Sequence, residues 1–419
     1  MRLSRPCLLL TLFLLCASTT RLSSQSNASP AITFKGASNY SQAELLTFTG
    51  LKPGSATQQQ MNDAAQRLND TGLFDEVNFA GNDREIVFTL KPARATLLAR
   101  FSNFIWWQDD ELNRNIKARI PLYRASAVPS NGNMEDEICA ALKALLEEKS
   151  VSDASISLRT DGSHLVFSID SPSVRIRLLT LNGASPAMQP KIAHVLHEMA
   201  GQPWDKDETF KDISVRVGDD YRNDGYREFA LVNEAHSAPT ITANGIELEL
   251  TAAINEGPQY HVSHFDWAGS EVLSPADLKK IATLKVGDLD SAYFLQESLQ
   301  LIAKAYQTKG FMLAMASAPP VVDPATHQVS YTLSVVAGPL YHFNSVRFVG
   351  VSDELGKQLS AAWQMKPGDV YDGTYARKFI TQNPALLKQG YRPIPQPKID
   401  SVVHTVDITM SYLKAAPAK

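Results

Sequence analysis

The stretch that decides the fold is AGPLYHFNSVRFVG, residues 337–350, because residues 256–269 repeat its layout as EGPQYHVSHFDWAG. Each stretch opens on a Gly-Pro pair, continues as a run of apolar and aromatic residues with polar ones between them, and ends on glycine. Such a run is typical of a β-strand, and the glycine after it favours a tight turn. Two copies of one layout in a single chain indicate an internal repeat.

Prolines mark the joints between repeats. Pro92, Pro172, Pro258 and Pro339 lie 80, 86 and 81 residues apart. Eleven residues after these prolines come, in order, Asn103, Gly183, Gly269 and Gly350, and Gly36 takes the same place in the first repeat. Asn and Gly both tolerate the positive φ that a tight turn can need, so we expect Asn103 to keep the role of the glycines.

Two further marks follow at fixed offsets. Eighteen residues beyond the first mark stand Gly54, Gly201, Gly287 and Gly368, with Pro121 in the divergent second repeat. A helix-closing mark comes later, at Gly72, Ser150, Gly225, Gly310 and Gly390. Four residues before that mark every repeat has an apolar or aromatic residue: Leu68, Leu146, Tyr221, Tyr306 and Leu386. These offsets predict two helices between the marks, the second packed on a sheet.

The fourth repeat shows the elements most clearly. Its second helix carries a stripe at i, i+4, i+7 and i+11, namely Leu295, Leu299, Ile302 and Tyr306, with Asp290 as a possible cap. Two strand-like runs follow, at 311–318 and 328–336. In the fifth repeat Pro384 should kink or split the second helix. The predicted unit is β-α-α-β-β, an α+β layer in which a small three-stranded sheet is covered by two helices.

Five such units account for the chain of 419 residues. The expected division is 1–28 as a signal peptide and linker, then 29–93, 94–171, 172–257, 258–339 and 340–413 as repeats, and 414–419 as a tail. The first segment has Arg2 and Arg5 before an apolar run from Cys7 to Cys16, which is typical of a cleaved secretory signal. The chain is therefore expected to be exported.

Taken together, these phrases resemble POTRA domains. LKVGDLDSAYF and MKPGDVYDGTY, then AYQTKGF and LLKQGY, continue the pattern in the same order in the fourth and fifth units. The resemblance implies a periplasmic location, with peripheral contact to the outer membrane, as for the soluble arms of outer-membrane assembly proteins and two-partner secretion transporters. It implies that the partner is an outer-membrane β-barrel protein or a nascent outer-membrane polypeptide. No barrel of at least eight strands fits after the last repeat.

Charge and cysteine content exclude other classes. Without Arg2, Arg5 and Arg21 the chain has 37 basic and 44 acidic residues, a net charge of −7, so no nucleic-acid partner is expected. Only Cys139 then remains, and no intramolecular disulfide can form. We interpret Cys139 as a small core residue on an apolar helix face.

No pattern in the chain predicts catalysis. His194, His197 and Glu198 lie on one expected helix, but their i, i+3 spacing is not that of zinc proteases and no third ligand is evident. The acidic pairs at 109–110, 147–148 and 219–220 are interpreted as solvated helix faces. We therefore predict no catalytic, cofactor-binding or metal-binding residues and no small-molecule substrate. Trp106 and Trp107 could form an aromatic binding patch, or pack in the core.

An exposed sheet edge is the expected site of partner binding. Small sheets leave unpaired N–H and C=O groups on edge strands, onto which an extended peptide can add by β-augmentation. We expect the edge to be the strand before the last in each unit. The most apolar example is Phe311, Met312, Leu313, Ala314 and Met315. An alternative is a structural or division-type interaction scaffold anchored by an uncleaved N-terminal segment, and an enzyme with a site buried between repeats is the third.

Overall fold

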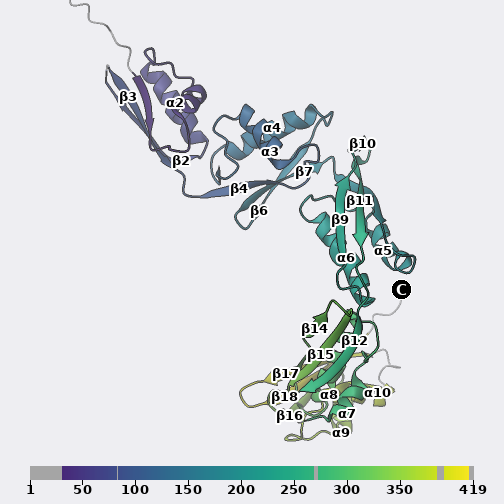
Figure 1. Ribbon diagram of the computed structural model, residues 1–419. Coiled ribbons are helices and arrows are strands. Elements are labelled where there is room, and N and C mark those ends of the chain that lie inside the picture. Colours follow the sequence, from purple (N-terminus) through teal and green to yellow (C-terminus); the bar gives the residue numbers. More distant parts are fainter. Residues whose placement is uncertain (1–30, 83, 269–271, 385–390, 415–419) are drawn as a thin grey trace, which may run out of the picture. The chain divides into compact units, whose positions relative to one another are not determined.

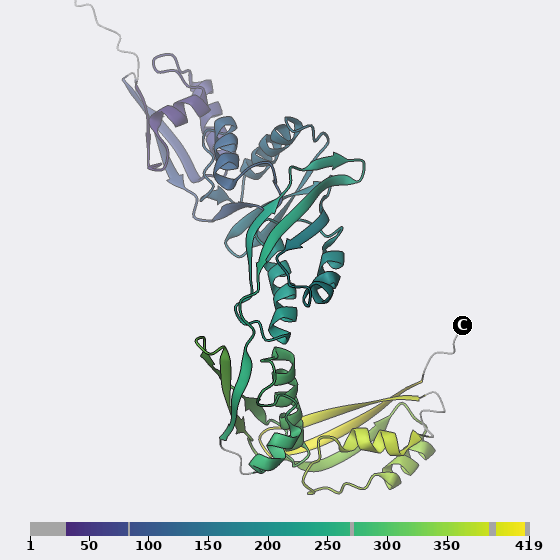
Figure 2. The same cartoon turned by 45° about the vertical axis from the view of Figure 1, so that its right-hand side comes forward.

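A computed structural model describes residues 31–414 except 83, 269–271 and 385–390. The described chain forms five small sheets, and in each the helices of the same repeat lie against the sheet (Figures 1 and 2). Contacts divide it into two compact units, Met1–Ser171 and Pro172–Lys419. The α+β fold of tandem β-α-α-β-β repeats is thereby confirmed.

The first unit holds two repeats. Repeat 1 consists of β1 (Ala31–Lys35), α1 (Gln42–Thr49), α2 (Gln58–Asp70), β2 (Phe74–Gly81) and β3 (Glu85–Pro92). Repeat 2 consists of β4 (Thr96–Phe101), α3 (Asp109–Arg119), β5 (Val128–Pro129), α4 (Met134–Glu147), β6 (Ser155–Asp161) and β7 (His164–Ser171).

The second unit holds three repeats. Repeat 3 consists of β8 (Val174–Asn182), α5 (Gln189–Met199), α6 (Thr209–Asn223), β9 (Ala230–His236), β10 (Thr240–Thr242) and β11 (Gly245–Asn255). Repeat 4 consists of β12 (His261–Ala268), α7 (Pro275–Ile281), α8 (Ala292–Gln307), β13 (Met315–Ser317), β14 (Pro320–Asp323) and β15 (Gln328–Val336). Repeat 5 consists of β16 (His342–Val349), α9 (Asp353–Ala362), α10 (Tyr375–Gln382), β17 (Tyr391–Asp400) and β18 (Thr405–Lys414).

The last strand of each repeat lies in the middle of its sheet. It pairs in parallel with the first strand and antiparallel with the strand that precedes it, as in the order β16-β18-β17. The expectation of three strands is correct for repeats 1 and 5 and wrong for the others, which have four. In repeats 3 and 4 the added strand arises because the outer strand is broken into β9 and β10 or β13 and β14, and in repeat 2 the short β5 joins β4.

Each core lies between a sheet and the helices of its repeat. Leu68, Leu146, Tyr221 and Tyr306, one turn before the helix-closing mark, are at most 1% exposed. The fifth position, Leu386, lies outside the described residues. The helix α10 ends at Gln382, two residues before Pro384, as a proline at that place requires.

Glycines of the first mark are needed for a close approach to the central strand. A Cβ on Gly350 would lie 2.3 Å from the carbonyl oxygen of Tyr412 in β18, and φ at Gly350 is +80°. Gly36 and Gly183 meet the last strands of their own repeats in the same way, and Gly269 lies outside the described residues. These glycines fix how closely the turn after the first strand can approach the last one.

Asn103 does not adopt the positive φ of the glycines at this mark, so the expectation of a positive φ there is wrong. Its side chain instead bridges to the last strand: Nδ2 donates to the carbonyl of Ile169 at 2.9 Å, and Oδ1 accepts from the Ile169 N–H at 2.7 Å. The amide thus satisfies both backbone groups of one residue. Ser150, which replaces glycine at the closing mark, does adopt a positive φ, of 65°.

Two glycines of repeat 5 should respond differently to alanine. Gly350→Ala adds a clash to an unfavourable φ and should destabilise repeat 5 by about 3 kcal/mol or more. Gly368, at φ +92°, has nothing within 4 Å of a Cβ, so Gly368→Ala should cost only about 1–2 kcal/mol. Hydrogen exchange of repeat 5 amides in the full chain would measure both, and equal losses would contradict the close approach.

Candidate functional site

Residues 311–314 do not form the expected edge strand. The N–H of Phe311 donates to the carbonyl of Tyr306 at 3.2 Å, and the N–H of Ala314 donates to the carbonyl of Phe311 at 3.2 Å. These bonds make a turn that closes α8 after Gly310, and only Met315 enters β13. The strand prediction for Phe311, Met312, Leu313 and Ala314 is wrong because the helix-closing turn uses the backbone groups that a ladder would need.

The same residues belong to the joint between repeats 4 and 5. Phe311 and Ala314 pack in the core of repeat 4, whereas Met312 packs against the core of repeat 5. Leu313 and Met315 remain 48% and 68% exposed. A turn that contributes to both cores couples the two repeats and still presents apolar surface.

Every first strand has part of its outer edge hydrogen-bonded to a turn, a short strand or a side chain. In repeat 5 the N–H of Phe343 donates to the carbonyl of Asp369 at 2.8 Å, and the N–H of Gly368 donates to the carbonyl of Phe343 at 2.8 Å. Equivalent bonds join β8 to Gly201 and β12 to Gly287, and β5 pairs with β4. In repeat 1 the Gln42 side chain bonds both the N–H and the carbonyl of Phe34. The turn at the second mark therefore occupies part of this edge in repeats 3 to 5.

The opposite edge is the strand before the last, as expected from the sequence. β2, β6, β9 with β10, β13 with β14, and β17 each pair with a neighbour on one side only. These strands carry the outward-facing backbone groups onto which another strand could add. Their ability to accept one depends on the residues that occupy them.

β17 is blocked by three prolines at alternate positions. Pro393, Pro395 and Pro397 lie opposite Tyr412, Met410 and Ile408 of β18. Proline has no N–H, so it is tolerated only where that group would point away from the ladder. The outer edge of β17 thus has three successive positions without a donor. The spacing PIPQP was readable in the sequence as the mark of a protected edge.

The edges of repeats 3 and 4 are interrupted. β13 and β14 are separated by Ala318 and Pro319, and β14 itself begins with Pro320. β9 carries a register shift where Asn233 adopts a φ of 55°. Short strands, prolines and bulges all reduce the pairing capacity of an edge.

β2 and β6 contain no proline, and the register shift in each lies at the start of the strand. β2 pairs without interruption from Glu76 to Gly81, and β6 from Ile156 to Asp161. The N–H of Asn82 donates to the carbonyl of Glu85 at 2.9 Å, which fixes the alternation along β2 and leaves the Val77 and Phe79 N–H groups facing outward. In repeat 2 the carbonyl of Phe167 accepts from Ser102 in the β4 direction at 3.1 Å, so the N–H of Leu158, opposite Phe167, faces outward.

A buried polar cluster holds the joint between repeats 3 and 4. The carboxylate of Asp290, whose side chain is 1% exposed, pairs with the guanidinium of Arg227 and accepts the hydroxyl proton of Tyr331. Arg227 also donates to the Tyr331 hydroxyl oxygen at 3.3 Å. Burial and the neighbouring carboxylate raise the pKa of Tyr331. Asp290 is therefore not the helix cap that the sequence suggested; Ser291 caps α8.

Loss of Arg227 should loosen repeat 4. Arg227→Ala leaves the Asp290 carboxylate with one partner in a buried place, and we expect a loss of about 3 kcal/mol. The triple variant R227M/D290Y/Y331I copies Met312, Tyr371 and Ile408, the residues at the matching places of the next joint, and should lose less. Hydrogen exchange across β12 and β15 would measure both. An equal loss would show that the pairing contributes nothing.

The joint between repeats 1 and 2 depends on Glu44. Its carboxylate accepts from Arg124 at 2.9 Å and lies 3.2 Å from the Lys117 ammonium, while Ser41 donates its N–H at 2.9 Å. The pKa of Glu44 is lowered to about 2. The largest cause is the backbone hydrogen bond from Ser41, and the two cations lower the pKa further. Arg124 also lies 4.6 Å over the Tyr40 ring.

Glu44 should make the stability of the joint between repeats 1 and 2 sensitive to acid. Because its pKa is depressed from an ordinary 4.5, its contribution is complete above pH 4.5 and is lost as the pH falls towards about 2. The melting temperature of Glu44→Gln should therefore fall less than that of the unmodified chain between about pH 5 and about pH 2. Parallel pH curves for the two proteins would contradict this role.

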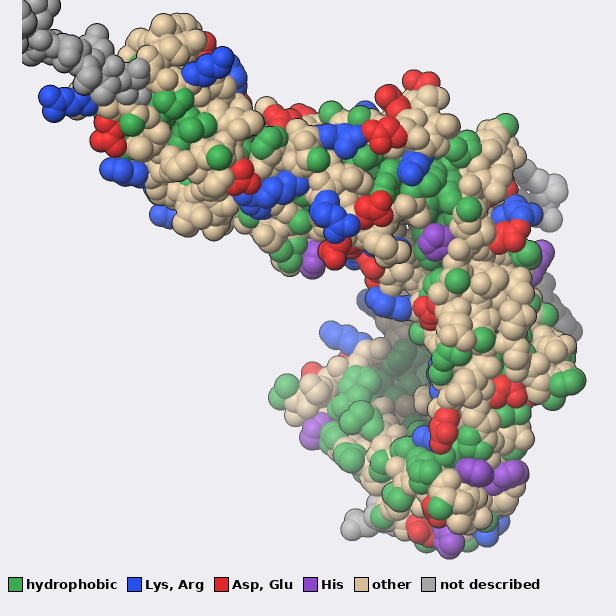
Figure 3. Space-filling model, turned by 45° about the horizontal axis from the view of Figure 1, so that its top comes forward, with side chains coloured by type: hydrophobic (Ala, Val, Ile, Leu, Met, Phe, Trp, Pro, Cys, Tyr) green, Lys and Arg blue, Asp and Glu red, His purple; other side chains and the backbone are tan. Residues whose placement is uncertain are grey.

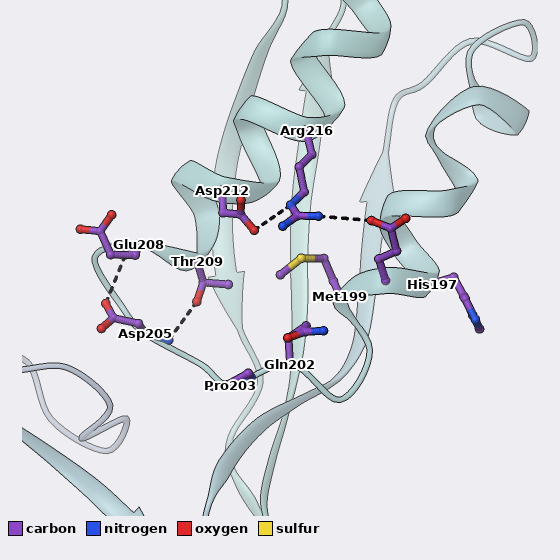
Figure 4. Close-up of a pocket in the computed structure, with 10 residues that line it drawn as sticks. His197, Met199, Gln202, Pro203, Asp205, Glu208, Thr209, Asp212 and Arg216 are labelled. Carbon is purple, nitrogen blue, oxygen red and sulfur yellow. Dashed lines mark hydrogen bonds and ion pairs between the residues drawn. The ribbon is translucent and has the colours of Figure 1, made fainter. Parts of the chain in front are cut away.

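A hollow lies on repeat 3, between the ends of α5 and α6. It has a volume of about 540 Å³ (Figure 4). Its charged groups bind one another: Arg216 pairs with Asp212 at 2.9 Å and with Glu198 at 3.2 Å. Asp205 accepts from the backbone N–H of Glu208 at 3.2 Å. The guanidinium of Arg216 is therefore paired with two carboxylates of the hollow.

The two histidines of α5 do not converge on a ligand. His194 contacts the Lys191 carbonyl at 2.8 Å, and its Nδ1 lies 3.8 Å from a carboxylate oxygen of Asp220, whereas His197 points away from the hollow (Figure 4). No group of three residues suited to hold a metal ion occurs among the described residues. No helix in that part of the chain is long and apolar enough to cross a membrane.

The two adjacent tryptophans and the cysteine singled out from the sequence are buried or half-buried. Trp107 is buried, at 8% exposed, and Trp106 is half-buried beside it with ring centroids 5.7 Å apart. Cys139 is half-buried on α4, and burial raises the pKa of its thiol. Basic and acidic side chains alternate on the face shown in Figure 3, and neither sign forms a continuous patch there.

Solved structures to which the chain is similar include fragments made of POTRA domains. A fragment with domains POTRA3-5 of BamA from Haemophilus influenzae is 19% identical and covers 57% of this chain and 95% of its own, with a TM-score of 0.41. POTRA1-3 of Omp85 from Anabaena is 18% identical, over 59% and 97%, with a TM-score of 0.25. CdiB from Escherichia coli is 16% identical, over 56% and 37%, with a TM-score of 0.22.

Neither a family model nor a curated protein matches the chain. The likenesses above concern the fold, and the identities are too low to carry an activity from those proteins to this one.

Proposed function

We propose that the chain is a non-enzymatic periplasmic scaffold that binds extended polypeptide segments during outer-membrane protein assembly or secretion. The segments add as strands to the outer edges of β2 and β6. The observation that carries the proposal is that these two edges are free of proline and continuous beyond a register shift at the start of each strand, whereas each first-strand edge is hydrogen-bonded over part of its length. Strand addition uses main-chain hydrogen bonds, so it can bind polypeptides that have different sequences but share an extended conformation.

The position of the open edges supports this reading. Both lie in the unit that ends at Ser171, and the following repeats carry bulges or prolines on the equivalent strand. Exposed edges promote aggregation, and proteins usually protect them. We would therefore expect β2 and β6 to be protected like the equivalent strands of repeats 3 to 5 if their edges had no function. The contrast favours a binding role for β2 and β6 and a structural role for the corresponding strands of repeats 3 to 5.

A proline scan of outward-facing N–H groups tests the proposal. Val77→Pro and Leu158→Pro each remove a donor that points away from the sheet and leave the ladder bonds in place, as Pro395 does in β17. The double variant should bind an extended peptide of alternating valine and threonine at least about tenfold more weakly, a loss of about 1.4 kcal/mol. Fluorescence anisotropy with the labelled peptide and the full chain would measure it.

Val77→Thr and Leu158→Ile are the matched controls. They alter the side chain and keep the N–H, so peptide binding should stay within about twofold of the unmodified chain. Hydrogen exchange of β3 and β7 would verify that all variants are folded. Unchanged binding in the double proline variant would overturn the proposed edges.

A further inference from the structure

The joint between repeats 3 and 4 and the joint between repeats 4 and 5 share one backbone arrangement. In each, the N–H of a tyrosine donates to the carbonyl of the glycine that closes the second helix of the preceding repeat. Tyr260 donates to Gly225 at 2.9 Å, and Tyr341 donates to Gly310 at 2.9 Å. Residues of one joint can therefore be matched to residues of the other by counting along the chain from these pairs.

A hollow recurs at the same place in both joints. Three matched residues line each hollow: Asp290, Tyr331 and Pro320 in the first joint, and Tyr371, Ile408 and Pro397 in the second. Within each set the proline of the outer strand pairs with the residue of the central strand. The hollow has a volume of about 180 Å³ in the first joint and about 360 Å³ in the second. The second joint thus keeps the hollow and makes it wider.

The cations of the two hollows differ in their partners. In the first hollow Arg222 is paired with Asp219 at 2.6 Å, and the other arginine belongs to the buried polar cluster described above. In the second hollow Lys304 takes the place of Asp219, six residues before the closing glycine. Lys304 of α8 and Arg377 of α10 have no hydrogen bond or ion pair with a described residue. Two unpaired positive charges therefore line the hollow of the second joint.

A further hollow adjoins this one and shares both cations. It also has a volume of about 360 Å³, and it has Lys304, Thr374 and Arg377 in common with its neighbour. Lys378 lines it as well, but its ammonium pairs with Asp372 at 2.7 Å. No aspartate or glutamate is among the described residues that line either hollow. We call these two hollows of the second joint the cationic groove.

The two repeats that supply the cations are in direct contact beside the groove. The N–H of Gly373 donates to the carbonyl of Gln307 at 3.0 Å. A Cβ on Gly373 would lie 3.2 Å from the Cβ of Gln307 and 3.1 Å from the sulfur of Met312, so glycine allows α8 and the start of α10 to come close. The backbone contact thus holds the cationic groove in shape, and a ligand need not order it on binding.

The lining of the groove suits an anion that carries an apolar group. Tyr371 and Ile408, which are 2% and 1% exposed, lie beside Pro395 and form an apolar lining below the cations. Inorganic phosphate would leave this lining uncovered. The N–H and the hydroxyl of Thr374, which could hold a phosphate at the start of α10, are already bonded to Asp372 at 2.8 and 2.7 Å. A carboxylate with an apolar neighbour uses both parts of the groove.

The exposed rim favours a polypeptide segment over a small molecule. Sites for small molecules usually enclose most of the surface of the ligand. Lys304 and Arg377 are exposed, so the groove stays open to solvent along its cations. An extended chain can lie in such a groove and continue beyond it.

We propose that the cationic groove binds an acidic segment of a partner polypeptide. A carboxylate of the segment pairs with Lys304 and Arg377, and a neighbouring apolar side chain covers Tyr371 and Ile408. The site is separate from the edges of β2 and β6, which belong to the other compact unit. It adds a preference for acidic sequence to a chain whose strand edges read only an extended backbone.

A peptide titration tests the groove. The probe is a short labelled peptide of alternating leucine and glutamate, acetylated and amidated so that all its carboxylates are side chains. It is titrated by fluorescence anisotropy into the full chain carrying V77P/L158P, in which the edges of β2 and β6 are blocked. Adding K304Q/R377Q should weaken binding at least about tenfold, because both partners of the carboxylate are lost. The difference should shrink as salt is raised, since the cations are exposed.

K357Q/R392Q is the matched control variant, made in the same V77P/L158P chain. It removes the same charge from two exposed residues of repeat 5 that line neither hollow, so binding should stay within about twofold. A control peptide of alternating leucine and glutamine should bind equally to all three proteins.

Equal binding of the leucine–glutamate peptide with and without K304Q/R377Q overturns the proposal. An equal loss in K357Q/R392Q, or a loss with the leucine–glutamine peptide, overturns it as well. Displacement of the peptide by inorganic phosphate, but not by sodium chloride of the same ionic strength, would assign the cations to a phosphate ligand. Loss of binding to phosphatidylglycerol vesicles alone would assign them to lipid, and either assignment also overturns the proposal. These outcomes leave the edges of β2 and β6 untouched, because both are blocked in every protein titrated.

Discussion

The close approach of a turn to the central strand is the constraint on which each repeat depends. In repeats 1, 3 and 5 a glycine makes it possible, because no Cβ fits beside the carbonyl of the last strand. In repeat 2 the amide of Asn103 achieves the same attachment with two hydrogen bonds. Once this turn is placed, the first strand is held in parallel beside the last, and the helices that follow must cross the same face.

The covered edge follows from that arrangement. In repeats 3 to 5 the turn at the second mark bonds back to the first strand and occupies part of its outer edge, so the strand before the last presents the longer free edge. Proline, bulges and strand breaks then decide, repeat by repeat, whether that edge remains usable. The chain thereby combines two open edges with three protected ones on a common framework.

The joints show how one backbone design can take different chemistry. Between repeats 3 and 4 a carboxylate, a guanidinium and a phenol satisfy one another away from water. Between repeats 4 and 5 the matching residues are Met312, Tyr371 and Ile408, and the contact is apolar. Both solutions use the same hydrogen bonds from a tyrosine N–H to a closing glycine, so the geometry does not depend on the side chains that fill it.

The sequence by itself determined the repeat, the order of its elements and the positions of its turns. These properties are local, since a glycine with positive φ or an apolar residue one turn before a helix end acts within a few residues. It also placed the free edge on the strand before the last. Only the tertiary structure decided that 311–314 is a turn within a joint, that Asp290 pairs with Arg227 and Tyr331, and that β2 and β6 remain open. The pairing of Asp290, for example, depends on partners 41 and 63 residues away, because groups distant in the chain compete for the same bonds.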